Sequence, residues 1–244
     1  MIVLLCVAVG RRDGVVRGVT LLHNVVYIVC LGSSSIIRFD AVTHRRLADI
    51  TAAGCVWRVS SDGEDVKRLL PKSPSDTIRP YTLSVTSSRL LVTSRDTNQL
   101  RQFDTVGDER SRVDLPRDMD PRHAVESLTG TFIVSHYNTQ LKQCQVSEVD
   151  TGGQVLRQFS GSHLLPLGYT PHVAVDSQGN IFVADEYRGC LLLLDSQLAL
   201  RRVIIDKHQL NYKKPQRLCY SEQLGQLLVV LGGRGVVVFD VIRR

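Results

Sequence analysis

The sequence lacks the short motifs by which many metal sites and enzymes are recognised. Its six cysteines form no Cys-x-x-Cys pair, and neither the cysteines nor the histidines have a spacing typical of metal ligands. There is no Gly-x-Ser-x-Gly elbow of a hydrolase, no phosphate-binding P-loop and no Gly-x-Gly-x-x-Gly motif. We therefore expect no metal, no cofactor and no catalytic residue, which favours a protein that is not an enzyme.

Linkers and long apolar segments are missing as well. No Gly/Ser-rich or Pro-rich stretch divides the 244 residues, so we expect a single domain over residues 1–244. The apolar run of residues 1–9 is too short to span a bilayer and too short for a complete signal peptide. It is either the closing strand of the last repeat or the remnant of a longer targeting segment.

Most of the cysteines stand inside apolar segments that resemble β-strands. A free thiol in such a place packs as a small hydrophobic group. This usage favours a reducing compartment and a cytoplasmic location, because disulfides form mainly in secreted proteins. The apolar N-terminal run leaves secretion open.

The formal net charge of +6 makes a nucleic acid or an acidic surface worth considering as a partner. The arginines are scattered, however, and many fall in segments that we expect to be outermost strands, such as Arg110, Arg157 and Arg201. Charged side chains on outer strands discourage edge-to-edge pairing. Much of the positive charge is thus explained without a ligand, and nothing indicates DNA binding.

What the sequence does contain is an internal repeat. Residues 171–204 hold four apolar runs that are separated by Gly/Asn/Asp turns, which predicts four antiparallel strands. The same order recurs elsewhere, and each third run ends in an aspartate, namely Asp40, Asp104, Asp150, Asp195 and Asp240. The last four are spaced by about 45 residues, the length of a propeller blade. The side chains of these aspartates are expected to accept backbone N–H groups in turns.

The first interval is too short for this period. Residues 54–62 match residues 189–197, so that Ser60 stands where Asp195 stands, only about 20 residues after Asp40. About two strands are then missing near residues 49–54. The sequence therefore predicts an all-β, six-bladed propeller whose second blade is incomplete.

Residues 171–195, PHVAVDSQGNIFVADEYRGCLLLLD, resemble the NHL repeat, with its Pro, Val-Ala-Val-Asp strand, Gly-Asn turn and Ile-Phe-Val-Ala-Asp strand. The resemblance is strongest over residues 171–204 and weak before residue 62. It implies a six-bladed propeller that serves as an interaction platform for proteins or RNA. Related six-bladed folds include lactonases and lyases, so the resemblance implies the fold and not the activity.

The start of a blade's first strand and the end of its second strand lie at the same rim. The predicted binding face consists of the residues at these positions, which are Arg17, Tyr81, Arg95, Arg122, His136, His172, Asp185, Glu186, Arg188, Gln216 and Arg234. Arginine can bind phosphate or carboxylate, and Tyr and His can stack on bases. His123, by contrast, is expected to be buried and hydrogen-bonded.

Three functions fit these features. The first is a scaffold that binds a protein partner through this face. The second is RNA binding through the same face, which requires a continuous positive patch and a steep dependence on salt. The third is a hydrolase or lyase of the lactonase type, for which most first-strand positions carry unsuitable residues: Arg, Tyr, His and Gln in place of inward Glu, Asn and Asp.

Overall fold

The computed structural model contains only β-strands as regular elements in the part of the chain that it describes. The chain divides into two compact units, residues 1–112 and 113–244. None of the described residues belongs to a helix long and apolar enough to cross a membrane. The described residues are 15–22, 25–31, 34–36, 50–52, 55–59, 66–71, 78–86, 88–94, 96–161, 166–168, 171–211, 213–221, 225–232 and 235–241.

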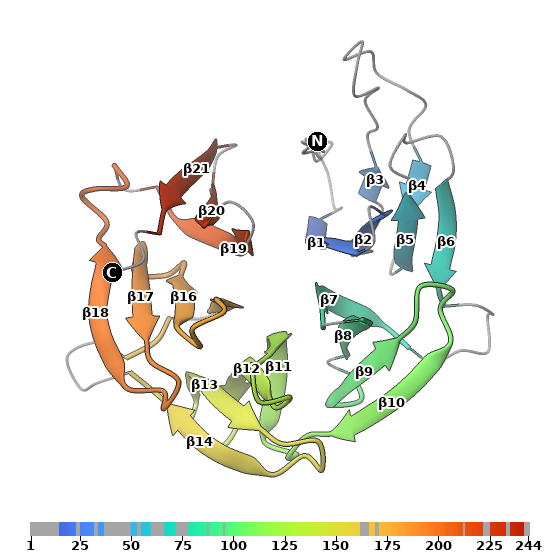
Figure 1. Cartoon of the computed structure of the whole chain (residues 1–244), viewed down its shortest axis with the longest axis horizontal. Helices are drawn as coiled ribbons and strands as arrows, with labels where there is room; N and C mark the ends of the chain where they lie inside the picture. The colour runs from blue at the N-terminus through green and yellow to red at the C-terminus, as the bar shows by residue number, and fades with distance from the viewer. Residues whose placement is uncertain are drawn as a thin grey trace. The chain divides into compact units, whose positions relative to one another are not determined.

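Unit 2, residues 113–244, contains three antiparallel sheets in which each strand pairs with the next one along the chain (Figure 1). The first sheet consists of β11 (Met119–Glu126), β12 (Phe132–Asn138), β13 (Gln143–Val149) and β14 (Val155–Phe159). The second consists of β15 (His172–Val175), β16 (Ile181–Asp185), β17 (Cys190–Leu194) and β18 (Leu200–Ile205). The third has only β19 (Pro215–Ser221), β20 (Gln226–Leu231) and β21 (Gly235–Asp240) among the described residues.

Unit 1, residues 1–112, contains two four-stranded sheets and a short ribbon. One sheet consists of β1 (Val15–Leu22), β2 (Val25–Leu31), β5 (Cys55–Val59) and β6 (Val66–Leu70). The other consists of β7 (Pro80–Val85), β8 (Leu90–Ser94), β9 (Gln99–Phe103) and β10 (Glu109–Asp114), of which the last two residues belong to unit 2. The ribbon pairs β3 (Ser34–Ile36) with β4 (Ile50–Ala52).

Within each unit the sheets are stacked through their first strands. In unit 2, β15 contacts both β11 and β19, and in unit 1, β7 contacts β1 and β2. Successive four-stranded meanders that contact one another through their first strands are the arrangement of propeller blades. The all-β, propeller-like architecture expected from the repeat is therefore confirmed.

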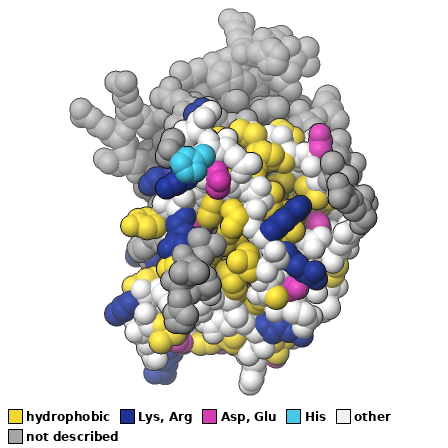
Figure 2. Space-filling view, turned by 90° about the vertical axis from the view of Figure 1, so that its left-hand side faces the viewer, with side chains coloured by type: hydrophobic (Ala, Val, Ile, Leu, Met, Phe, Trp, Pro, Cys, Tyr) yellow, Lys and Arg dark blue, Asp and Glu magenta, His cyan; other side chains and the backbone are white. Residues whose placement is uncertain are grey.

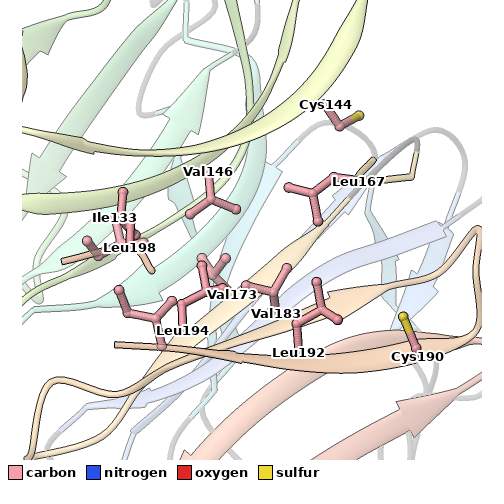
Figure 3. Packing of buried hydrophobic residues seen from close by; sticks show 11 residues of the cluster. Ile133, Cys144, Val146, Leu167, Val173, Val183, Cys190, Leu192, Leu194 and Leu198 are labelled. Atoms are coloured by element: carbon pink, nitrogen blue, oxygen red, sulfur yellow. The ribbon is translucent and has the colours of Figure 1, made fainter. Parts of the chain in front are cut away.

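Alternation of side chains along the strands explains how the central sheet of unit 2 is covered on both faces. Val173, Val183 and Leu192 face the sheet of β11–β14 and pack in one apolar cluster with Ile133 and Val146 (Figure 3). The residues between them along the strands, which are Ala174, Phe182, Ala184 and Leu191, face the other way and pack against β19 and β20. Because both faces of this sheet are buried, its strands consist of nearly continuous runs of apolar residues.

Three of the aspartates that mark the period have the role expected of them. In the turns after β9, β13 and β17, the Oδ1 atoms of Asp104, Asp150 and Asp195 each accept two backbone N–H groups at 2.8–3.0 Å. Asp240 instead accepts a hydrogen bond from Gln226 on the neighbouring strand. Asp40 lies outside the described residues.

The prediction of six blades with a half-blade near residues 49–54 is wrong for the described part of the chain. This part contains four complete four-stranded sheets and one sheet of three strands. The segment matched to residues 189–197 does form a third strand, β5, but it pairs with β2, with Cys30 opposite Cys55. The unpaired edge of a strand can pair with any strand that reaches it. Here β5 pairs with the edge of β2, which belongs to the preceding repeat. The two repeats thus share one complete sheet, and the β3–β4 ribbon stands between β2 and β5 in the sequence.

Two further predictions remain as they were. Residues 1–9, predicted to be a closing strand or a targeting remnant, lie outside the described residues. The prediction of one domain over residues 1–244 also stays a prediction.

Candidate functional site

The first strands share an irregularity at the positions that the sequence singled out. In four of them the pairing register shifts by one residue directly after a proline or valine, which leaves one bulged residue on the first strand. The bulged residues are Arg17, Tyr81, Arg122 and Gln216. A bulge changes the direction of a side chain and is common at the rims of β-structures and beside binding sites. His172 is the exception, since it begins β15 in regular pairing with Ala184.

The sheets of unit 2 have two distinct edges, which we call the upper and lower rims. At the upper rim the first strands β11, β15 and β19 begin, and the second strands β12, β16 and β20 end. Contacts between neighbouring sheets support this alignment: His123 of β11 stacks on His172 of β15 at the upper rim. At the lower rim, the turn that holds Leu128 lies beside Gly179 in the equivalent turn of the next sheet.

Arg122 is buried at the upper rim and does not present its charge to solvent. Its Nη2 atom donates to Asp120 Oδ2 at 2.8 Å, within the same strand. A buried guanidinium needs such a partner because desolvation of an isolated charge is costly. The bulge thus directs Arg122 into a local ion pair.

His136, at the end of β12, is also buried. Its Nε2 atom lies 2.8 Å from the hydroxyl of Ser147 on β13. Burial lowers the pKa of His136 to about 4, although Asp118 and Asp120 act in the opposite direction. The imidazole is therefore neutral at pH 7 and serves as a buried hydrogen-bonding group.

His123 and His172 form a stacked pair, with ring centroids 3.6 Å apart and planes inclined by 24°. Burial, and secondarily the charge of Arg217 on β19, lowers the pKa of His123 to about 3. The pKa of His172 lies well below its ordinary value, mainly through burial and further through His123 and Arg217. The burial predicted for His123 is confirmed, but its Nδ1 atom has no hydrogen-bond partner among the described residues.

Asp185, at the end of β16, fixes the loop that follows it. Its carboxylate accepts the backbone N–H groups of Gly168, at 2.7 Å, and Arg188, at 3.0 Å. Burial raises the pKa of Asp185, and these hydrogen bonds together with the charge of Arg188 oppose the shift. A Cβ atom at Gly168 would overlap the carboxylate and Tyr187 Cβ, so this approach requires glycine.

The same loop is tied to the third sheet. Gln216 Nε2, on β19, donates to Glu186 Oε1 at 2.9 Å. Between the two anchored residues Glu186 and Arg188 stands Tyr187, whose exposed fraction is 71%. The loop therefore holds an exposed aromatic side chain on a backbone fixed at both sides.

The other predicted residues are not gathered at this rim. Tyr81, in unit 1, is buried. For Arg17 only the strand is described, and Arg95 and Arg234 lie outside the described residues. In unit 2 the structure thus brings together Arg122, His136, His172, Asp185, Glu186, Arg188 and Gln216, with the first four buried.

The three arginines of the expected outer strands that were named above, Arg110, Arg157 and Arg201, have local partners. Arg110 binds Asp104 and Arg157 binds Glu148, while Arg201 Nε lies 3.1 Å from Asp195 Oδ2. Figure 2 shows the side of the molecule on which β18 lies, where Lys and Arg side chains are interspersed with apolar ones. These pairs agree with outer strands whose charge limits edge pairing.

No group of three or more His, Cys, Asp or Glu side chains within the described ranges is arranged to hold a metal ion. No protein-family model matches the chain, and no curated protein does. Solved structures do resemble it. A chain of the nidogen/laminin complex matches 94% of this chain and 77% of its own length, with 14% identity and a TM-score of 0.61. The structure of YCF48 bound to D1 peptide matches 94% of this chain and 78% of its own length, with 11% identity and a TM-score of 0.62.

Virginiamycin B lyase from Staphylococcus aureus is a third similar structure, with 11% identity, a TM-score of 0.55 and coverage of 94% of this chain and 71% of the lyase. These neighbours are β-propellers. The chain has a propeller-like fold. At such low identities the likeness extends to the fold and not to the activity.

Two residues of the upper rim of this propeller-like unit were missed from the sequence. Tyr187 stands between Glu186 and Arg188, but a pattern of polar residues at strand ends does not indicate an aromatic residue between them. Leu141, in the loop between β12 and β13, is likewise exposed. A search for large apolar residues in the loops between second and third strands would have found both.

Proposed function

We propose that the chain is a non-enzymatic, NHL-like propeller that binds a protein partner through the upper rim of unit 2. The exposed side chain of Tyr187 is the observation that carries this proposal. Tyrosine supplies a large contact area at little conformational cost and is enriched at the centres of protein interfaces. Its loop is already ordered by Asp185 and Gln216, so binding does not have to pay for ordering the backbone.

The buried histidines and arginine weigh against the RNA alternative. Base stacking requires accessible rings, and phosphate binding requires accessible guanidinium groups. His136 and His172 are buried, and Arg122 is engaged by Asp120. RNA binding therefore stays a prediction with less support than protein binding.

A cytoplasmic location is part of the proposal. Cys144 and Cys190 are buried free thiols. Burial raises the pKa of Cys144 to about 12 and that of Cys190 to about 11, so both remain protonated and unreactive at neutral pH. Buried thiols of this kind suit a reducing compartment.

Capture of partners from cell extract on immobilised protein tests the function, with Tyr187→Ala as the informative variant. Leu128→Ala is the matched control, because Leu128 is 62% exposed but lies at the lower rim. We expect wild type and Leu128→Ala to retain the same set of proteins. The amount of these proteins bound to Tyr187→Ala should be at least ten-fold lower, and nuclease treatment should leave them bound to wild type. Equal retention by Tyr187→Ala, or loss of the set on nuclease treatment, would contradict the proposal.

A further inference from the structure

The loops at the two rims of unit 2 differ in the sign of their charge. The lower rim consists of the turns that join first to second strands and third to fourth strands, and the charged residues described in these turns are all acidic: Asp150, Asp176 and Asp195. The upper-rim loops, which join second to third strands and one sheet to the next, are mainly basic. Their described basic residues are Arg117, Lys142, Arg188, Lys207, Lys213 and Lys214, against the acidic Asp118, Glu186 and Asp206. A partner that approaches the upper rim therefore meets positive charge.

Three of these basic residues, Lys207, Lys213 and Lys214, stand in the connection between β18 and β19, which lies beside the loop of Tyr187. A Cβ atom at Gly189, the last residue of that loop, would lie 3.4 Å from Lys207 Cβ and 4.0 Å from the carbonyl oxygen of Lys213. The connection that carries the three lysines is thus in contact with the loop that presents Tyr187.

Hydrogen bonds of the backbone hold this connection in place. Asp206 Oδ1 accepts the backbone N–H groups of His208, at 2.9 Å, and of Gln209, at 3.0 Å. Leu210 is buried, and its carbonyl oxygen accepts the backbone N–H of Lys213 at 3.0 Å. The segment is therefore ordered without the use of its lysine amines, as the Tyr187 loop is ordered without the use of its tyrosine ring.

The charge of the three lysines is available to a partner. Lys207, Lys213 and Lys214 are exposed, and their amines form no hydrogen bond or ion pair within the described part of the chain. Lys207 acts electrostatically on Asp206, but that carboxylate is already engaged by two backbone N–H groups. Arg122 at the same rim, by contrast, is buried and ion-paired with Asp120.

We propose that the protein partner of the upper rim binds through an acidic segment, whose carboxylates lie against Lys207, Lys213 and Lys214 while an apolar side chain packs on Tyr187. This inference rests on the proposed function and names the chemistry of its partner. Complementary charge is the argument for it, because opposite charges across an interface select the partner and its register.

A peptide fits this surface better than a nucleic acid does. Glu186 and Asp206 stand among the basic residues and would repel the evenly spaced phosphates of a nucleic acid, whereas the carboxylates of a peptide can be placed to avoid them. Single-stranded nucleic acids are bound by rows of aromatic side chains on which successive bases stack, and Tyr187 is one exposed ring.

Fluorescein-labelled hexaglutamate is the probe, and its binding is followed by fluorescence anisotropy at low ionic strength, where exposed charges are least screened. We expect binding that is about ten-fold weaker in the double variant Lys207→Gln/Lys213→Gln. Arg201→Gln/Arg202→Gln is the matched control, because it removes the same charge from exposed residues of β18 and should bind as wild type does. Unlabelled hexauridylate, which has a similar charge, should compete more weakly than unlabelled hexaglutamate.

Equal binding by the two double variants would overturn the acidic partner, as would better competition by hexauridylate. If Lys207→Gln/Lys213→Gln does not fold, as judged by circular dichroism, the competition experiment on wild type decides. The proposed function fails separately. Lysine-dependent binding of hexaglutamate without Tyr187-dependent capture of proteins would retain the acidic ligand and overturn the proposed function. Tyr187-dependent capture without lysine-dependent binding of hexaglutamate would do the reverse.

Discussion

The two rims of unit 2 use the same device in opposite environments. At the lower rim, Asp195 accepts two backbone N–H groups while partly exposed, and these hydrogen bonds, that from Ala199 foremost, lower its pKa. At the upper rim, Asp185 also accepts two backbone N–H groups but is buried, and burial raises its pKa. The lower-rim solution recurs from sheet to sheet with the same residue type, whereas the upper-rim anchors differ: Asn138 accepts the backbone N–H groups of Gln140 and Leu141 after β12, and Asp185 accepts those of Gly168 and Arg188 after β16. The repeated rim is thus mainly structural, and the variable rim can carry recognition.

Acid should have the largest effect, and it should act through the upper rim. The pKa values of His123 and His136 are about 3 and about 4 in the fold, against 6.5 in a model peptide. At a pH between the folded pKa values and 6.5, the unfolded chain binds more protons than the folded chain. The stability that these histidines contribute is therefore fully present above pH 6.5 and falls as the pH decreases toward 4. The loss is on the order of 3 kcal/mol for each histidine. Urea unfolding midpoints measured from pH 7.5 to 4 test this.

The variant His123→Phe keeps an aromatic ring against His172 and removes one titrating group. We expect a shallower decline of stability with falling pH in this variant. His208→Gln, which changes an exposed histidine of unit 2, is the control and should follow wild type. A midpoint that does not change between pH 6.5 and 4.5 would contradict the buried neutral state of these rings.

Glycine substitutions sharpen the comparison next. A Cβ atom at Gly168 would overlap the Asp185 carboxylate and Tyr187 Cβ, and the backbone N–H of Gly168 would lose its acceptor if it moved. Gly168→Ala should therefore destabilise by about 3 kcal/mol. At the lower rim, a Cβ at Gly152 would lie 3.3 Å from Asp150 Oδ1, so Gly152→Ala should cost less than about 1 kcal/mol. Chemical denaturation of both variants measures the difference, and equal losses would show that the two sites are equally tight.

The sequence allowed the repeated parts of this molecule to be predicted, because each repeat places the same residue in the same surroundings. Asp150 and Asp195 could be assigned to turns for this reason, as could the four strands of residues 171–204. The pairing of β2 with β5 could not, because a strand's partner is selected in three dimensions from the available edges. The number of sheets in the described part of the chain depends on this pairing and could not be predicted either.

The candidate site likewise has parts that could be predicted from the sequence and parts that could not. The bulged positions Arg122 and Gln216 could be located from the strand starts, but their contacts could not. The stack of His123 on His172 joins neighbouring sheets, so no local spacing reports it. Tyr187 was missed because exposure of a loop side chain depends on how the loop is held. Asp185, which holds it, appeared in the sequence only as a polar residue at a strand end.

The aspartates themselves give the smallest effects and the most direct test of the comparison. Asp185→Ala leaves two backbone N–H groups without their acceptor in a buried place, which should destabilise by about 2–3 kcal/mol. Asp195→Ala removes equivalent hydrogen bonds where water can replace them, and a loss of about 1 kcal/mol is expected.

The pH dependence of the two aspartates' contributions to stability differs in sign. Because the pKa of Asp185 is raised in the fold, its contribution to stability falls as the pH rises above the ordinary pKa of an aspartate. Because the pKa of Asp195 is lowered, its contribution to stability falls as the pH decreases. Unfolding free energies of the two variants from pH 3 to 7 measure both quantities, and a larger loss in Asp195→Ala would reverse the assignment of the two rims.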